Sequence, residues 1–451
     1  MNERNLLDLC HTLLEHARKA GADHAEVAAA WQRSSDTHIE NGSVHTVQSC
    51  EETTYGLRVL VGTSQGFVTA NDLEPGLLAE RAAEAVAQAR VNPSDPFHGL
   101  VEPSIVAPVP GLYDDEVADL TSQHTTALAA DMLARIRDLD PRVRVDSGSV
   151  SASVSVQALA STTGVAASEA GSHVDASLFG MAVDGEDVAS FDYDNAVSRR
   201  WRGFDADMIQ ACERFVTKCR AGLGAGRGES FRGPIVLSPD AVAEFLLPAL
   251  MSAVCADTVR KGRSPLADKT LQSIASPLLH VWDDGRVPGG PSSSAFDREG
   301  MPTVRRAIVA AGVLQGFLFN HYEARAAGGA ARSTGNATGG AGSLPSVGPH
   351  RLEIDPGTVA MDDLVASGER AMWVGRYSGS TNAVTGDFSG VVKNGFLLEK
   401  GRRRPVREVL IAGNLFEMLG RISALSRERQ DVGGSALVPA IRAEDVSITA
   451  G

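Results

Sequence analysis

The sequence predicts an α+β protein built from three successive parts. Residues 1–91 show helical spacing, then strand-type runs, then helical spacing again. Residues 112–228 switch from a helical to an alternating period, and residues 229–451 carry mostly strand and turn signals. A stretch with five prolines, residues 92–111, separates the first two parts. At roughly 100 to 200 residues per domain, a chain of 451 residues has room for all three.

The first part, residues 1–91, is expected to be an N-terminal α+β domain. We expect a helix at 4–20, strands at 25–31, 37–39, 44–47, 55–61 and 67–70, and a second helix from Pro75. Asn41-Gly42 is a hairpin signal. Residues 62–66, Gly-Thr-Ser-Gln-Gly, match the turn that carries a serine nucleophile between a strand and a helix. Both flanks predict strands, so we expect a hairpin turn there.

The proline-rich stretch 92–111 is expected to be a linker, because proline suits neither a helix interior nor a sheet ladder. The middle α+β domain, residues 112–228, then begins with helical spacing from Val117 to Ile136. Strands from about residue 150 to 195 and a closing helix around 208–219 follow. Within this part, residues 192–195, Asp-Tyr-Asp-Asn, lack the glycine and glutamate of a calcium loop, so we expect a solvated turn.

Residues 229–451 are expected to form a large β-rich C-terminal domain. Its clearest helical patterns lie near 239–259 and 414–425. Asp283-Asp284 is expected in a turn or a helix cap, because adjacent side chains diverge and rarely share one substrate. The glycine-rich stretch 328–342 matches no phosphate-binding pattern and is expected to be a surface loop or a loop that lines a substrate site.

Composition limits the classes of partner. With 56 acidic and 42 basic side chains, the formal charge of -14 disfavours nucleic acid as a partner. No apolar stretch reaches the roughly 20 residues that span a bilayer, and the N-terminus lacks a secretory pattern. The five cysteines form no Cys-x-x-Cys pair, which favours reduced thiols and a cytoplasmic location. The histidines form no local ligand set, so the pattern predicts no catalytic metal site.

Four strings in the C-terminal part are similar to those of one family. They are FDREGMPT at 296–303, ARSTGNA at 331–337, NAVTGDFSG at 382–390 and PVREVLIAGNL at 405–415. These strings, with Ala25-Glu26-Val27 and residues 55–59 near the N-terminus, resemble the TldD/PmbA family. In that family, TldD and TldE (PmbA) subunits form a zinc metallopeptidase. The resemblance spans nearly the whole chain and implies the same three-part fold.

The resemblance also implies a division of labour between two subunits. The TldD-type subunit carries His-Glu-x-x-x-His and a later cysteine as zinc ligands. The corresponding stretch here, Leu247 to Ser252, has no imidazole or carboxylate, and no cysteine follows Cys255. The chain therefore resembles the TldE type: no catalytic residue, no metal ligand and no cofactor of its own, with zinc in a TldD-type partner. The resemblance further implies a heterodimer that encloses a peptide substrate, with self-pairing of the isolated chain.

Six polar residues are our candidates for contacts to the substrate in that cavity: Ser333, Thr334, Asn336, Thr385, Asp387 and Ser389. The alternative role for all six is hydrogen bonding within turns, where such residues are common. The alternative function is an independent or homodimeric enzyme, or a peptide-binding protein, with chemistry that does not use zinc and a place in a biosynthetic pathway.

Overall fold

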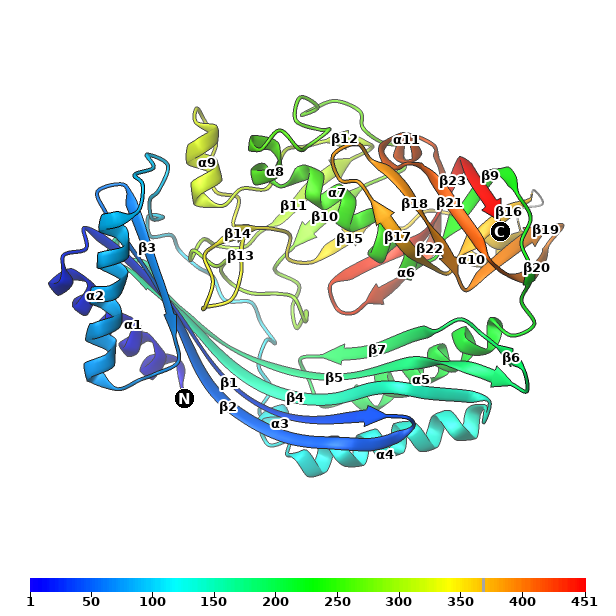
Figure 1. Cartoon of the computed structure of the whole chain (residues 1–451), viewed down its shortest axis with the longest axis horizontal. Helices are drawn as coiled ribbons and strands as arrows, with labels where there is room; N and C mark the ends of the chain where they lie inside the picture. The colour runs from blue at the N-terminus through cyan, green and yellow to red at the C-terminus, as the bar shows by residue number, and fades with distance from the viewer. Residues whose placement is uncertain (367–369) are drawn as a thin grey trace.

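The computed structural model describes residues 1–366 and 370–451. The first half of the chain forms a long, curved sheet with helices on one face (Figure 1). Its elements are α1 (Glu3–Ala20), β1 (His24–Glu40), β2 (Ser43–Val61), β3 (Ser64–Ala70), α2 (Pro75–Val91), α3 (Asp115–Ala118), α4 (Ser122–Leu139), β4 (Val143–Ser161), β5 (Ala166–Asp184), β6 (Asp187–Val188), β7 (Asp192–Ser198) and α5 (Phe204–Ala221).

The curved sheet contains strands from both sides of the proline-rich stretch. Its order is β3-β2-β1-β4-β5-β6, and β7 also pairs with β5. The hairpin predicted at Asn41-Gly42 is confirmed: both residues have positive φ, 49° and 70°, as a two-residue turn requires. The turn at Gly62 is also a hairpin, with β3 rather than a helix after it. The two separate runs predicted at 25–31 and 37–39 are instead one strand, β1.

The two faces of this sheet differ in chemistry. Alternate residues of β1 such as Val27, Trp31 and Ile39 pack under the helices α1, α2, α4 and α5. Alternate residues of β4 such as Val150 and Val154 do the same. Because successive side chains on a strand point to opposite faces, the intervening residues, many of them serine, face away from the helices.

The second half of the chain forms the C-terminal body. Its elements are β8 (Gly226–Arg227), β9 (Phe231–Leu237), α6 (Pro239–Ala241), the π-helical turn η1 (Val242–Leu246), α7 (Leu247–Val254), α8 (Ala256–Arg260), β10 (Val281–Asp284), β11 (Arg305–Ala310), β12 (Val313–Leu314), α9 (His321–Ala327), β13 (Ala337–Thr338), β14 (Ser346–Val347), β15 (Leu352–Ile354), α10 (Met361–Ala366), β16 (Ala371–Val374), β17 (Arg376–Thr381), β18 (Asp387–Lys393), β19 (Gly395–Glu399), β20 (Arg402–Arg407), β21 (Val409–Asn414), α11 (Leu415–Gly420), β22 (Ile422–Val432) and β23 (Ala436–Ala450).

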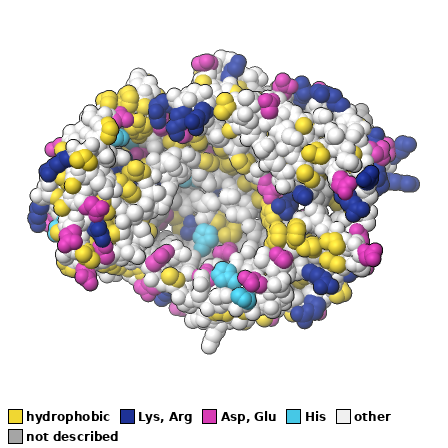
Figure 2. All heavy atoms as spheres, viewed as in Figure 1, with side chains coloured by type: hydrophobic (Ala, Val, Ile, Leu, Met, Phe, Trp, Pro, Cys, Tyr) yellow, Lys and Arg dark blue, Asp and Glu magenta, His cyan; other side chains and the backbone are white. Residues whose placement is uncertain are grey.

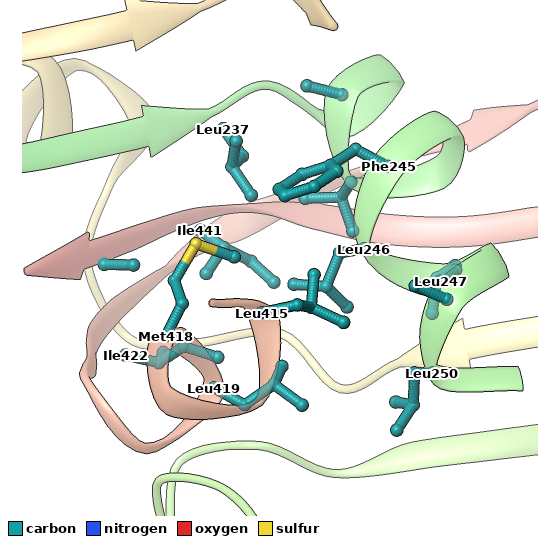
Figure 3. Packing of buried hydrophobic residues seen from close by; sticks show 14 of the residues in the cluster. Leu237, Phe245, Leu246, Leu247, Leu250, Leu415, Met418, Leu419, Ile422 and Ile441 are labelled. Carbon is teal, nitrogen blue, oxygen red and sulfur yellow. The ribbon is translucent and has the colours of Figure 1, made fainter. Parts of the chain in front are cut away.

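One large mixed sheet organises the C-terminal body. Its main path runs β12-β11-β10-β15-β23-β9-β16-β19-β20-β8. Off this path, β21 and β22 pair with β23, β18 pairs with β21, and β17 pairs with β18. The continuous helix α6-η1-α7 packs on this sheet. Leu246 and Leu250 meet Leu415 and Leu419 of α11 in the apolar core between them (Figure 3).

Four local predictions were wrong. Residues 192–195 belong to strand β7, where Asp192 and Asp194 are buried, rather than to a solvated turn. Asp283-Asp284 ends strand β10, and Asp283 is buried because it accepts hydrogen bonds from Asn336 Nδ2 and the His350 backbone. The helix predicted at 414–425 ends at Gly420, where β22 follows. The helix near 239–259 breaks at Cys255, which has extended backbone angles.

In the part of the chain that the structure describes, no helix is both long and apolar enough to cross a membrane.

Candidate functional site

The polar face of the curved sheet looks toward the C-terminal body. Figure 2 shows the surface hollowed between the two, with histidine and acidic side chains along its walls. Beside this hollow, a cavity of about 300 Å³ is lined by Ala28–Ala30 of β1, Gln157–Leu159 of β4 and residues 337–341 of the C-terminal body. The sheet therefore forms the floor of the hollow, and the C-terminal body forms its opposite wall.

Two rows of polar residues cross this floor. In the first row, Asp36 of β1 lies opposite Ser151 of β4, which lies opposite Asp175 of β5. Ser34 Oγ and Ser151 Oγ donate hydrogen bonds to the two carboxylate oxygens of Asp36, at 2.7 and 2.5 Å. Burial, with the charge of Asp36, raises the pKa of Asp175 to about 6. The row thus places a hydrogen-bonded carboxylate near a carboxyl group that binds its proton more tightly than an exposed aspartate does.

The second row places Ser153 of β4 opposite His173 of β5. Burial, with the nearby charge of Arg199, lowers the pKa of His173 to about 4, so its ring is neutral at pH 7. Among the described residues, no hydrogen bond joins this ring to a serine or a carboxylate. The floor therefore contains the residue types of a nucleophile and a base without the hydrogen-bonded arrangement that activates a nucleophile.

A buried ionic cluster attaches the C-terminal body to the sheet beside the hollow. Arg58 Nη2 and Arg298 Nη1 donate to the two oxygens of Glu26, at 2.8 and 3.1 Å. Burial opposes ionisation of Glu26, but the two guanidinium groups prevail and lower its pKa. Glu299 lies next to the cluster, and its Oε2 accepts the His321 backbone N–H at 2.8 Å. Burial raises the pKa of Glu299, although Arg58 opposes the shift.

The first group of sequence-predicted site residues is held by internal hydrogen bonds. Asn336 is buried, and its Nδ2 donates to Asp283 Oδ2 at 2.6 Å and to the Gly348 carbonyl at 3.1 Å. Thr334 Oγ1 donates to Asn336 Oδ1 at 2.8 Å, and Ser333 Oγ lies 3.4 Å from the Phe319 carbonyl oxygen. The cavity beside the hollow begins one residue later, at Ala337.

The second group lies at the hairpin between β17 and β18. Thr385 Oγ1 donates to Asp387 Oδ2 at 2.8 Å, and Asn414 Nδ2 donates to Asp387 Oδ1 at 3.0 Å. Thr385, Asp387 and Ser389 are all exposed. No hydrogen bond or ion pair between described residues joins this group to the first. The substrate role of all six residues stays a prediction, and the turn hydrogen bonds supply the alternative role.

The helix aligned with the zinc motif offers no ligand set. Leu247 points into the apolar core (Figure 3), Pro248 is exposed but carries no donor atom, and Ser252 has only a hydroxyl. Zinc in proteins is held by thiolate, imidazole and carboxylate groups, so these side chains do not fit the ion. Across residues 1–366 and 370–451, no three His, Cys, Asp or Glu side chains lie close enough together to hold a metal.

Sequence reasoning missed the floor rows and the ionic cluster. The alternation of serine with valine and alanine from Val150 to Ala158 marked a strand, and its serine positions were the available signal for a polar floor. Glu26 and Arg298 are 272 residues apart, so no local pattern could have joined them.

Sequence models of three protein-family domains match successive parts of the chain. The PmbA/TldA metallopeptidase domain 1 matches residues 25–92, the central domain matches 115–218, and the C-terminal domain matches 230–450. The chain belongs to the PmbA/TldD family. The family resemblance and the α+β fold predicted from the sequence are thereby confirmed.

Individual relatives agree with this assignment. The chain is 24% identical over 456 residues to metalloprotease PmbA of Escherichia coli O157:H7, covering 98% of this chain and 96% of that protein. It is 26% identical over 417 residues to a metalloprotease of Methanothermobacter thermautotrophicus, covering 90% and 88%. The crystal structure of TldE from Thermococcus kodakarensis matches the fold with a TM-score of 0.89 at 22% identity, covering 98% of this chain and all of that chain.

Proposed function

We propose that this chain is the TldE-type subunit of a two-subunit peptidase of the PmbA/TldD family. It supplies part of the chamber that receives an unfolded or modified peptide, and a TldD-type partner supplies the zinc and the catalytic base. The observation that carries the proposal is the apolar helix at 247–252, where Leu247, Pro248 and Ser252 stand at the ligand positions of the zinc motif.

The hollow supports the chamber role. Its floor presents serine, aspartate and histidine side chains rather than an apolar surface, which suits a chain whose backbone is still unpaired. Zinc bound by a partner would polarise the scissile carbonyl and activate water. The residues of this chain would bind and orient the peptide, and its open sheet edges could pair with extended backbone. A chamber shared between two subunits also needs an extensive interface, above roughly 2,000 Å².

Reconstitution with a TldD-type subunit from the same genome tests the proposal. The isolated chain should contain no stoichiometric zinc and should not cleave an unfolded peptide. The pair should contain about one zinc and cleave, and light scattering should give the mass of a complex. About one zinc per isolated chain, lost on histidine substitution, or a stable monomer that ignores the TldD-type subunit, would contradict the proposal.

A further inference from the structure

A second cavity lies where helix α5 meets the C-terminal sheet. It has a volume of about 390 Å³, within the range of small-ligand sites, and none of the six candidate residues lines it. Its apolar wall is made by Met361 of α10, Trp373 of β16 and Phe396 of β19. These three side chains come from neighbouring elements of one face of the C-terminal body.

The charged groups at the base of this cavity already have partners. Lys218 Nζ lies 2.9 Å from Asp194 Oδ2 and 2.6 Å from Asp240 Oδ2. Asp240 also accepts from Gln430 Nε2 at 3.3 Å, and Asp192 accepts from the Asn394 amide. Burial raises the pKa of Asp192 to about 6, although Lys218 opposes the shift. The charged groups at the base are therefore occupied by one another and by amide donors, and we do not assign ligand binding to them.

Two arginines at the cavity differ from these paired groups. The guanidinium carbon of Arg403 lies 5.3 Å from the ring centre of Trp373 and 4.5 Å from that of Phe396. It has no hydrogen bond or ion pair to any described residue. Within the part of the chain that the structure describes, Arg429 donates only to the Ile354 carbonyl, at 3.4 Å. Two acidic side chains lie nearby. Glu428 already accepts the Met361 backbone N–H at 2.8 Å and pairs with Arg427. The charge of Asp362 acts on Arg403, but no described ion pair joins the two side chains.

We propose that this cavity binds the carboxyl-terminal residue of a peptide, with its carboxylate on Arg403 and an apolar side chain against Trp373, Phe396 and Met361. A guanidinium group above an apolar wall, without a hydrogen bond or ion pair to a described residue, fits a ligand that carries one anionic group on an apolar body. A volume near 390 Å³ fits one large residue rather than a folded partner. The proposal rests on the peptide-chamber function and names which end of the peptide this subunit recognises.

Calorimetric titration of the full-length chain with two probes tests the proposal. The probes are acetyl-Ala-Ala-Phe with a free carboxylate and the same peptide as its carboxamide. The free acid should bind at least about tenfold more tightly than the amide, because a charge-assisted bidentate contact is lost in the amide. Arg403→Ala should weaken binding of the acid about tenfold and leave binding of the amide unchanged. Arg403→Lys, which keeps the charge but not the planar group, should fall between.

Arg402→Ala is the matched control. Arg402 is the preceding residue on β20, is exposed, does not line the cavity, and its removal changes the net charge equally. Equal affinity for acid and amide, equal effects of the two alanine variants, or no binding of the acid at about 1 mM would each overturn the proposal. The titration needs neither partner nor zinc. If the reconstituted pair cleaves normally but the titration fails, only the proposed binding of the peptide's carboxyl terminus is refuted. If the titration succeeds but the pair does not cleave, only the proposed chamber function is refuted.

Discussion

Replacing Arg298 with methionine should reduce the free energy of unfolding by about 1.5 to 3 kcal/mol. The Arg298 side chain is 5% exposed, and it donates to Glu26 Oε1, to the Gly340 carbonyl and to the Ser343 carbonyl. Methionine has a similar length and fills the same space, so the cost comes from lost charge and hydrogen bonds rather than from a cavity.

The size of the expected loss in stability depends on whether water can replace Arg298 at each of its hydrogen-bond partners. Gly340 and Ser343 are exposed, so water replaces the arginine at their carbonyls at little cost. Glu26 is 1% exposed, so water does not replace the lost ion pair there. Glu26 keeps its ion pair with Arg58, so the loss there is one hydrogen bond between charged groups, about 1.5 to 3 kcal/mol, and this term dominates.

Urea unfolding followed by tryptophan fluorescence measures the effect, because Trp31 reports on the curved sheet and Trp282 on the C-terminal body. The matched control is Arg202→Met, since Arg202 pairs with Glu116 at 3.1 Å but is 86% exposed. The control should lose less than about 1 kcal/mol. Equal small losses for both variants would show that the buried cluster does not stabilise the attachment of the C-terminal body.

Three further outcomes are expected. Burial raises the pKa of Glu299 from its ordinary 4.5 to about 8, so between these pH values the folded state keeps a proton that the unfolded state releases. The free energy of unfolding therefore falls as pH rises from about 4.5 to about 8. Glu299→Gln should remove this contribution, which urea midpoints measured across that pH range would show. Gly66→Ala should destabilise by about 1 to 3 kcal/mol, because the new methyl would lie 2.0 Å from the Ala85 carbonyl oxygen, whereas Gly76→Ala meets open space and should change the melting temperature little. Asp387→Ala should weaken cleavage by the reconstituted pair by about 1 to 3 kcal/mol in transition-state terms with an unchanged melting temperature; a lower melting temperature with normal cleavage per complex would instead support the turn role.

The local signals predicted the elements but not their full extent. Asn41-Gly42 predicted its hairpin because a two-residue turn depends on those residues alone. The single strand β1 was predicted as two runs, because Arg33 to Asp36 interrupt the apolar pattern. These residues stay in the strand because β2 and β4 pair with them on both sides.

Charged residues were the hardest to place from the sequence. Asp194 was expected at a solvated turn, yet it is buried because Arg214 and Lys218 of helix α5 neutralise it at 2.7 and 2.9 Å. A helix 20 residues further along the chain supplies that compensation, so a local pattern cannot reveal it. In the proposed complex, the roles of Asn336 and Asp387 would depend in the same way on groups that lie far away in the sequence or in another chain.

The pairing of β1 with β4 has a mechanical consequence. The register runs from Glu26 opposite Ser161 to Glu40 opposite Ser147 without a bulge, so this ladder ties the family's first domain to its central domain. Rotating one against the other would break many backbone hydrogen bonds at once. We therefore infer that the floor of the hollow moves as one rigid unit. The amides of both strands should then exchange with solvent in a single cooperative opening.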